Sequence, residues 1–159
     1  MIIGAIDPGA KGALAFIDTS DLNLVVWDAP TFSIKSGKTT KTKIDSVNFA
    51  EMIRTAAPDV MYVERVGAMP GQGVTSMFNF GFSAGILEGL CAMAGIRMEY
   101  RRPQEWQQTA RVPRGKDGSR ARASQLFPKH AMLFSRVKDD GRSDAVCLAY
   151  AGVLEHHEL

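Results

Sequence analysis

Residues 1–18 read MIIGAIDPGAKGALAFID, and this stretch decides the fold. It holds two apolar runs, 2–7 and 12–18, on either side of a Pro-Gly turn sequence, and a third run, LNLVVWD, follows at 22–28. Short apolar runs separated by turn residues are typical of neighbouring strands. The beginning of the chain therefore predicts three antiparallel strands joined by short turns.

The rest of the chain alternates between helical and extended patterns. Polar residues 29–45 predict a surface loop, and Ser143 marks the expected start of the final helix. Two further helices are expected over 46–57 and 76–94, a short one begins at Pro103, and another ends at Phe127. Strands are expected at 59–64 and 96–100. This order predicts an α/β fold with a five-stranded mixed sheet, three antiparallel strands then parallel strands, flanked by helices.

Helical spacing within 76–94 places several apolar side chains on one stripe, which predicts a core-facing surface. The stripe consists of Met77, Phe80, Ala84, Leu87, Leu90 and Cys91.

Composition is that of one folded domain spanning 1–159, with 45% hydrophobic and 23% charged residues. The chain lacks an apolar run of about 18 residues and a secretory signal, so we expect a cytoplasmic protein without a membrane segment. Cys91 and Cys147 lie in apolar stretches, which favours buried thiols. The ending LEHHEL resembles a vector-derived tail, so His156 and His157 receive no role.

Positive charge gathers in two segments, although the net charge is only +2. Residues 35–43 hold four lysines and no acid, and residues 97–122 hold eight Lys and Arg against three acids. Such segments suit a partner rich in phosphates, with a solvated surface as the plain alternative.

Four carboxylates fall where one site can collect them. Asp7 and Glu64 each end an apolar run, and the ends of parallel neighbouring strands meet at one sheet edge. Asp140 and Asp144 are four residues apart at the start of the final helix, so they share a face. Oxygen ligands without His or Cys favour Mg²⁺ or Mn²⁺.

Each carboxylate also has an ordinary interpretation. Asp7 precedes Pro-Gly and is also typical of an acidic residue in a turn. Glu64 could instead form an ion pair with a neighbouring arginine. Asp140 and Asp144 suit the start of a helix, where acids complement the macrodipole. Taken together, the four favour a metal-dependent site for in-line phosphodiester hydrolysis. The chain has no HExxH or GxxxxGK[ST] motif, which argues against zincins and P-loop enzymes.

Three acidic motifs in this order resemble those of RuvC-like Holliday-junction resolvases, in the RNase H-like nuclease superfamily. They are IGAIDPGAKGALAFID, YVERV and DGRSDAVCLAYAG, and the segments FGFSAGILEGL, RRPQEW and SRARASQLFP also resemble that family, most closely its phage-type members. The resemblance spans nearly the whole chain. It implies a homodimeric, Mg²⁺-dependent endonuclease that nicks opposing strands of a four-way DNA junction, in the bacterial host cytoplasm if phage-encoded.

The resemblance also implies which residues carry the chemistry. Asp7, Glu64 and Asp144 would bind two Mg²⁺ ions, for which Mn²⁺ substitutes. The family's fourth acid falls at Gly141, so we shift it to Asp140 and keep Asp139 in reserve. The family's basic residue near the site falls closest to Lys116, then to Arg120.

The expected DNA contacts are the basic residues of the two positive segments, among them Lys38, Lys41 and Arg114. The stretch 67–78 also carries Met69, Met77 and Phe78, one of which would press against unstacked bases, unless these side chains pack inward. The Gly- and Ala-rich helix 76–95 would form a two-fold interface between protomers, or approach the sheet closely.

Three alternatives stay open. One is a related nuclease acting on other branched DNA or on an RNA–DNA hybrid. The second is a nucleotide-binding module, because DPGAKGALAF also resembles the first phosphate loop of the actin-like fold, although 159 residues are few for its two lobes. The third is a DNA-binding protein that has the fold without the activity.

Overall fold

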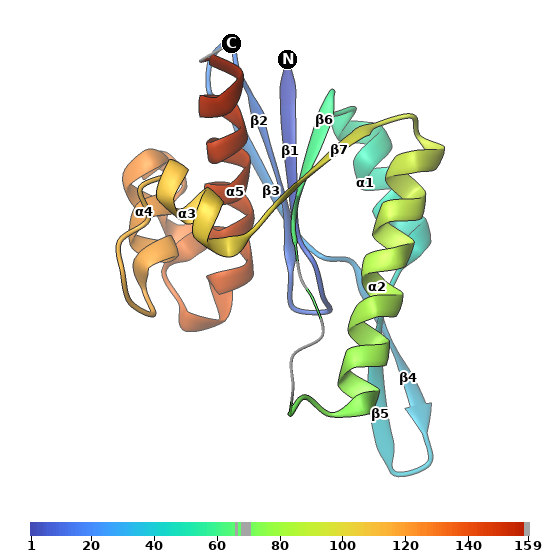
Figure 1. Ribbon diagram of the computed structural model, residues 1–159. Coiled ribbons are helices and arrows are strands. Elements are labelled where there is room, and N and C mark those ends of the chain that lie inside the picture. Colours follow the sequence, from blue (N-terminus) through green and yellow to red (C-terminus); the bar gives the residue numbers. More distant parts are fainter. Residues whose placement is uncertain (66, 68–70, 158–159) are drawn as a thin grey trace.

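The computed structural model describes residues 1–65, 67 and 71–157 (Figure 1). Its main sheet has the order β3-β2-β1-β6-β7. The five strands are β1 (Ile2–Asp7), β2 (Ala13–Asp18), β3 (Leu24–Asp28), β6 (Val60–Glu64) and β7 (Arg97–Arg101). β1, β2 and β3 pair antiparallel, whereas β6 pairs parallel with both β1 and β7. The predicted mixed sheet is confirmed.

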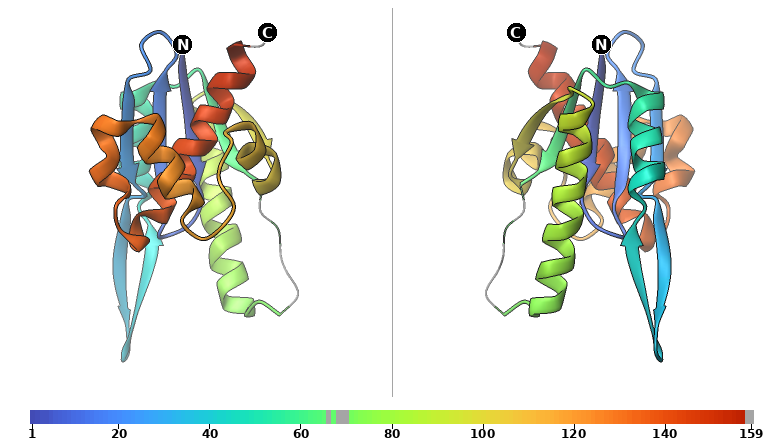
Figure 2. Two further views of the ribbon diagram at one scale, coloured as in Figure 1. Left: turned by 90° about the vertical axis from the view of Figure 1, so that its left-hand side faces the viewer. Right: turned by 90° about the vertical axis from the view of Figure 1, so that its right-hand side faces the viewer.

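Helices cover both faces of this sheet (Figures 1 and 2). One face carries α1 (Ser46–Ala56) and α2 (Val74–Met93). The other carries α3 (Pro103–Thr109), α4 (Gly118–Leu126), the 3₁₀ helices η1 (Pro128–Phe134) and η2 (Val137–Asp139), and α5 (Asp140–His157). In the described part of the chain no helix is long and apolar enough to cross a membrane.

A separate hydrophobic core lies on each face, because side chains alternate across a strand. Ile3 and Ala5 of β1 belong to the core under α5, and Ile6 belongs to the core under α1 and α2. Gly152 lets α5 lie directly on the sheet, since a Cβ there would come within 2.6 Å of the Tyr62 ring. The long apolar helix α5 is thereby fixed along the centre of the sheet.

The stretch 29–45 is not a loop, and this prediction was wrong. It contains an antiparallel ribbon of β4 (Thr31–Ser36) and β5 (Thr39–Ile44), which is a sheet of its own. The strand signal is weak because the β5 sequence, TTKTKI, buries only its last residue. A strand that packs on no core lacks the alternation of apolar residues by which strands are recognised.

The core stripe predicted on the helix 76–94 is only partly correct. Leu87 and Cys91 are the buried residues of α2, whereas the other members of the stripe are half-buried. The reason is the placement of α2, whose first half extends beyond the end of the sheet (Figure 1). Cys91 and Cys147 are both buried free thiols, as expected.

The final helix starts at Asp140, three residues before the predicted Ser143, and continues to His157. Its last described turns pack on the sheet. Glu155 accepts hydrogen bonds from Arg101 Nη2 at 2.6 Å and from Tyr62 Oη at 3.0 Å. The bond from Tyr62 and the burial of its ring raise the pKa of Tyr62 to about 12, with burial the larger cause. These contacts attach the end of α5 to β6 and β7.

Candidate active site

The structure brings the predicted carboxylates to the carboxyl end of the central strands. Asp7 is the last residue of β1, and Glu64 is the last residue of β6, its parallel neighbour. The first turn of α5 crosses the same edge and carries Asp140 and, one turn later, Asp144. Asp7, Asp140 and Asp144 line one groove of about 1160 Å³.

Three of these acids interact electrostatically with another carboxylate of the site. Burial first, and then the charges of Asp144 and Glu64, raise the pKa of Asp7 to about 8. Burial and the charge of Asp144 raise the pKa of Glu64, and burial and the charge of Asp140 raise that of Asp144. Three partly buried carboxylates are therefore held where full ionisation is unfavourable without a compensating positive charge.

Two side chains that sequence reasoning missed hold these acids in place. The buried indole of Trp106 in α3 donates from Nε1 to Oε2 of Glu64 at 3.1 Å. Ser119 in α4 donates to the carboxylate of Asp144, which lowers its pKa against the effect of burial. Both contacts join residues far apart in sequence, so no spacing reveals them, although Trp106 lies in the segment RRPQEW that carried the family resemblance.

Asp139, the reserve candidate, has a different partner. It is buried, and Arg136 donates to it from Nη2 at 2.8 Å, from Nε at 3.1 Å and from its backbone N–H at 3.0 Å. The hydrogen bonds from Arg136 lower the pKa of Asp139 to about 2. Arg142 lies 3.7 Å from the same carboxylate. This carboxylate is thus already neutralised by arginine.

Asp140 is half-exposed and pairs with Arg120, whose Nε lies 3.0 Å from its Oδ1. Arg120 also pairs with Asp117, while its Nε makes no hydrogen bond within the described residues. Of the two basic candidates near the site, the structure therefore places Arg120 beside an acid of the cluster. Lys116 is exposed on the preceding loop and does not line the groove of Asp7.

The first turn of α5 is anchored to the sheet by a bidentate ion pair. Arg142 donates to both oxygens of Asp28, at the end of β3, from Nε and Nη2 at 2.6 Å each. Between this anchor and Asp140, Gly141 packs against the turn after β1. The position of Asp144 over Asp7 is thus set by contacts that the sequence pattern did not indicate.

Cations that were not predicted surround the acids. Lys11, Arg136, Lys138 and Arg142 line the same groove as Asp7. An acidic centre with a basic rim suits a substrate that carries several phosphates. One phosphate would lie at the cations bound by the acids, and the neighbouring phosphates would contact lysine or arginine. The signal for Lys138 and Arg136 lay in the segment FSRVKDD before the last acidic motif, outside both positive segments considered above.

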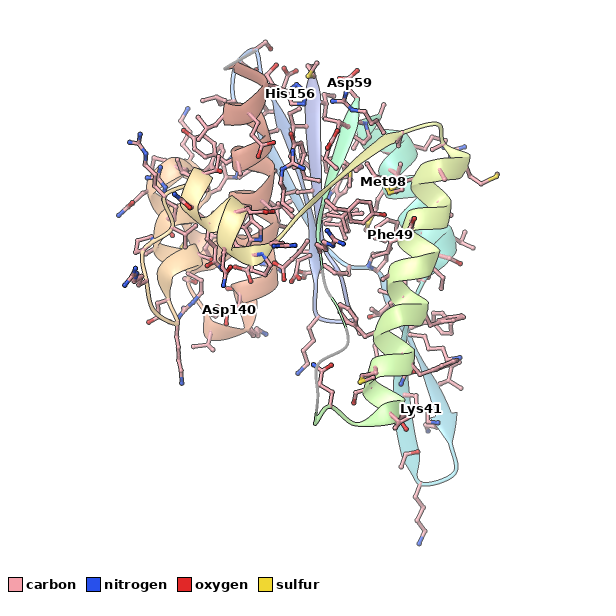
Figure 3. All side chains as sticks on the ribbon, in the orientation of Figure 1. Lys41, Phe49, Asp59, Met98, Asp140 and His156 are labelled. Carbon is pink, nitrogen blue, oxygen red and sulfur yellow. The ribbon has the colours of Figure 1, made fainter. Side chains whose placement is uncertain are left out.

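The remaining DNA candidates lie away from the acids. Lys38 and Lys41 belong to the β4–β5 ribbon, and Figure 3 shows Lys41 and Asp140 on opposite sides of the molecule. Arg114 is exposed on the loop before α4. Phe78 on α2 is 70% exposed and stacks on Phe82 with ring centroids 6.3 Å apart, so it does not pack inward. Met69 lies outside the described residues.

The donor chemistry fits a hard divalent cation, because Asp7, Glu64 and Asp144 offer only oxygen ligands. Among the described residues, however, no group of three His, Cys, Asp or Glu side chains is already arranged to hold a metal ion. The fit therefore rests on charge and ligand type, and the carboxylates would have to close in on a cation.

Comparison with solved structures identifies the fold. No family model and no curated protein matches the sequence. Thermus thermophilus RuvC in complex with a Holliday junction substrate superimposes with a TM-score of 0.68 over 99% of this chain and 96% of that chain, at 13% identity. The chain has the RuvC fold. A second Thermus thermophilus RuvC structure gives a TM-score of 0.61 at 14% identity over 99% of this chain and 96% of that one.

The RuvC fold also recurs in a eukaryotic protein. The yeast mitochondrial Holliday junction resolvase Ydc2 matches with a TM-score of 0.53 at 15% identity, over 96% of this chain and 79% of that chain. The RNase H-like, RuvC-like architecture expected from the three acidic motifs is therefore confirmed.

Proposed function

We propose that the protein is a divalent-metal-dependent endonuclease that resolves four-way DNA junctions. The observation that carries the proposal is the convergence of Asp7, Glu64 and Asp144 at the carboxyl edge of a RuvC fold. The similarity to a RuvC solved with a Holliday junction substrate covers 99% of this chain and supports the substrate class.

The acids would hold one or two Mg²⁺ ions, with Mn²⁺ as a substitute. Bound cations would supply an activated water and stabilise the departing oxygen of the cleaved phosphodiester. Asp7, Glu64 and Asp144 are the proposed ligands, since each has a pKa raised by burial and by a neighbouring carboxylate. Asp140 is the proposed fourth ligand, and its carboxylate would exchange the guanidinium of Arg120 for a cation.

The chain's own side chains would orient the substrate and the ligands. Trp106 fixes one oxygen of Glu64, and Ser119 fixes Asp144. Lys11 and Lys138 on the groove wall would bind the phosphates that flank the cleaved bond. Further phosphate contacts would come from Arg114, Lys116, Arg120, Lys38 and Lys41, and Phe78 would stack against unpaired bases at the branch point.

A homodimer would cut both strands symmetrically, and α2 is the proposed interface. This helix of 20 residues has one charged residue, Glu88, and buries only Leu87 and Cys91. Phe82 and Met93 of this helix are 53% and 89% exposed. An apolar helix that is this exposed favours a contact with another protein. In a two-fold dimer, a second copy of this chain would present the same apolar face to it.

The test of the activity compares a synthetic four-way junction, linear duplex and RNA–DNA hybrid over a Mg²⁺ titration. We expect paired nicks at symmetric positions of the junction and little cleavage of the other two. Asp7→Asn and Glu64→Gln should abolish cleavage and retain junction binding. Asp21→Asn is the matched control, because Asp21 lies in the β2–β3 turn at the opposite end of the sheet.

Preference for the hybrid would assign the protein to ribonuclease chemistry instead, and full cleavage by Asp7→Asn would remove Asp7 from the mechanism. The dimer is tested by measuring the solution mass of wild type and Gly85→Leu. Nothing lies within 4 Å of a Cβ at Gly85, so the protomer accommodates the change, whereas an interface on that face would not. A wild-type monomer at assay concentration would contradict the dimer.

A further inference from the structure

The β4–β5 ribbon lies outside the main sheet. Its strands pair only with each other and form a sheet separate from the main one. Of its described side chains only Ile44, at the base, is buried. A two-stranded ribbon without a core is marginally stable at best. A contact outside this protomer would therefore stabilise the projecting ribbon.

The ribbon projects from the edge of the molecule that carries the acids. Figures 1 and 2 show it extending beyond the ends of β1 and β6, alongside the first half of α2. Thr31, at its base, lines the groove that also holds Asp7. A long, rod-shaped partner lying over the acids can therefore continue onto the ribbon.

The pairing register gives the ribbon two different faces. Phe32 lies opposite Lys43 and Ile34 opposite Lys41, so these four side chains share one face. That face is turned toward α2, since the Lys43 ammonium lies 5.9 Å from the centre of the Phe82 ring. Beyond Ile44 at the base, the other face carries only polar side chains. Its members are Thr31, Ser33, Lys35, Thr40 and Thr42.

The polar face has the chemistry of a phosphate-binding surface. Lys35 lies on this face and Lys38 lies in the turn between the strands, and residues 35–43 contain no acid that would compensate these charges. Lys ammonium groups and Ser or Thr hydroxyls are the side-chain donors that contact DNA phosphates. Each strand has six residues and spans about 20 Å, the length of about 6 base pairs.

We propose that the polar face of the ribbon, with Lys35 and the turn residue Lys38, binds the phosphate backbone of a duplex arm. The contact covers about 6 base pairs beyond the acidic centre. This proposal rests on the proposed junction-cleaving function and assigns to the ribbon the binding of the substrate's duplex arms rather than of its branch point. Its contribution is to affinity, because the four acids of the site lie on β1, β6 and α5 and not on the ribbon.

The first test shortens the ribbon and varies the arm length of the junction. Residues 32–43 are replaced by a two-residue Asn-Gly turn that retains the Thr31–Ile44 pair, and the melting temperature checks the fold. We expect a Kd at least about 10-fold higher for junctions with 20-base-pair arms, and no change for arms too short to reach the ribbon. The single-turnover rate at saturating protein should stay within twofold, and the salt slope of log K should fall by about 2.

The second test separates the two faces. Lys35→Gln/Lys38→Gln should weaken binding to long arms by at least fivefold, and Lys41→Gln/Lys43→Gln, with the same loss of charge, by clearly less. Lys129→Gln, an exposed lysine on η1, controls for a single charge elsewhere. Equal losses from both pairs would overturn the assignment to one face.

Other outcomes overturn the inference in distinct ways. If ribbon removal leaves the Kd for long arms unchanged while wild type cleaves junctions, the ribbon does not bind DNA and the proposed function stands. If ribbon removal instead converts a dimer to a monomer, the ribbon is a protein interface. If wild type neither binds nor cleaves a junction, the proposed function fails first.

Discussion

Gly141 packs directly against Asp7, so that a Cβ at position 141 would lie 3.0 Å from the Asp7 Oδ2 atom and 2.6 Å from the carbonyl oxygen of Lys11. The first turn of α5 thus approaches the turn that follows β1 through the backbone of Gly141. This contact also explains why the fourth acid cannot stand at 141 in this chain. A carboxylate there would displace either the helix or the turn, and Asp140 carries the charge one residue earlier.

Replacing Gly141 should disturb the acidic centre without adding or removing charge. In Gly141→Ala the methyl group collides with backbone, so α5 has to move away from Asp7. We expect cleavage to fall by more than about 10-fold, equivalent to roughly 1.4 kcal/mol, and Mn²⁺ to bind more weakly by calorimetry. Unchanged Mn²⁺ affinity and cleavage would show that α5 does not abut Asp7.

Asp7 should make the metal-free protein less stable as the pH rises. Its pKa in the folded protein is raised to about 8 from an ordinary 3.8, mainly by burial. A raised carboxyl pKa contributes stability below about pH 4 that is lost as the pH rises to about 8. In EDTA at pH 8, Asp7→Asn should therefore be more stable than wild type, by roughly 2 kcal/mol or about 5 °C in Tm.

The pH series supplies the control for this prediction. At pH 4 wild type and Asp7→Asn should melt at nearly the same temperature, since the Asp7 carboxyl is then protonated in the folded protein. With saturating Mn²⁺ at pH 8 the order should reverse, because only wild type retains the full ligand set. Equal melting temperatures across the whole range in EDTA would contradict a buried, repelled Asp7.

The fluorescence of Trp106 should change when a metal ion binds, and its hydrogen bond to Glu64 should affect the pH dependence of that binding. Its indole N–H donates to Glu64, so its fluorescence should change on Mn²⁺ addition in a Trp27→Phe background, where it is the remaining tryptophan. In Trp106→Phe the lost hydrogen bond raises the pKa of Glu64 further. The pH midpoint for Mn²⁺ binding should then shift upward, and cleavage should fall about 10-fold. An unchanged midpoint would make Trp106 a packing residue only.

Asp139 and Asp140 should have different roles: Asp139 should stabilise the fold, and Asp140 should bind the metal ion. Asp139→Asn breaks the buried pair with Arg136 and should lower Tm by more than roughly 4 °C, with Mn²⁺ affinity within twofold of wild type. Asp140→Asn should weaken Mn²⁺ binding at least fivefold and leave Tm nearly unchanged. The reverse pattern would make Asp139 the fourth ligand.

The sequence indicated the sheet and its acids because both leave local patterns. Asp7 and Glu64 each interrupt an apolar strand at its end, and buried parallel strands place such interruptions together. The β4–β5 ribbon left no pattern, since strands without a core need no apolar alternation. The apolar stripe of α2 was read as core because periodicity shows that a face is apolar but does not show which surface covers it.

The residues that hydrogen-bond to the site carboxylates could not be predicted from the sequence, for a different reason. Trp106 and Ser119 act through single hydrogen bonds to residues 42 and 25 positions away. Such contacts depend on the docking of α3 and α4, not on any local spacing. The pairing of Asp139 with Arg136 was visible only as a short spacing that suits many ordinary loops.

The hydrogen bonds of Glu155 with Arg101 and Tyr62 bear on chemistry at the far end of the molecule. Tyr62 belongs to β6, the strand that ends in Glu64, and Glu155 lies 11 residues after Asp144 on α5, about 16 Å along the helix axis. The two elements that carry Glu64 and Asp144 are thus held in register by a bond remote from both. Changes in the last turns of α5 should therefore alter the separation between the Glu64 and Asp144 carboxylates.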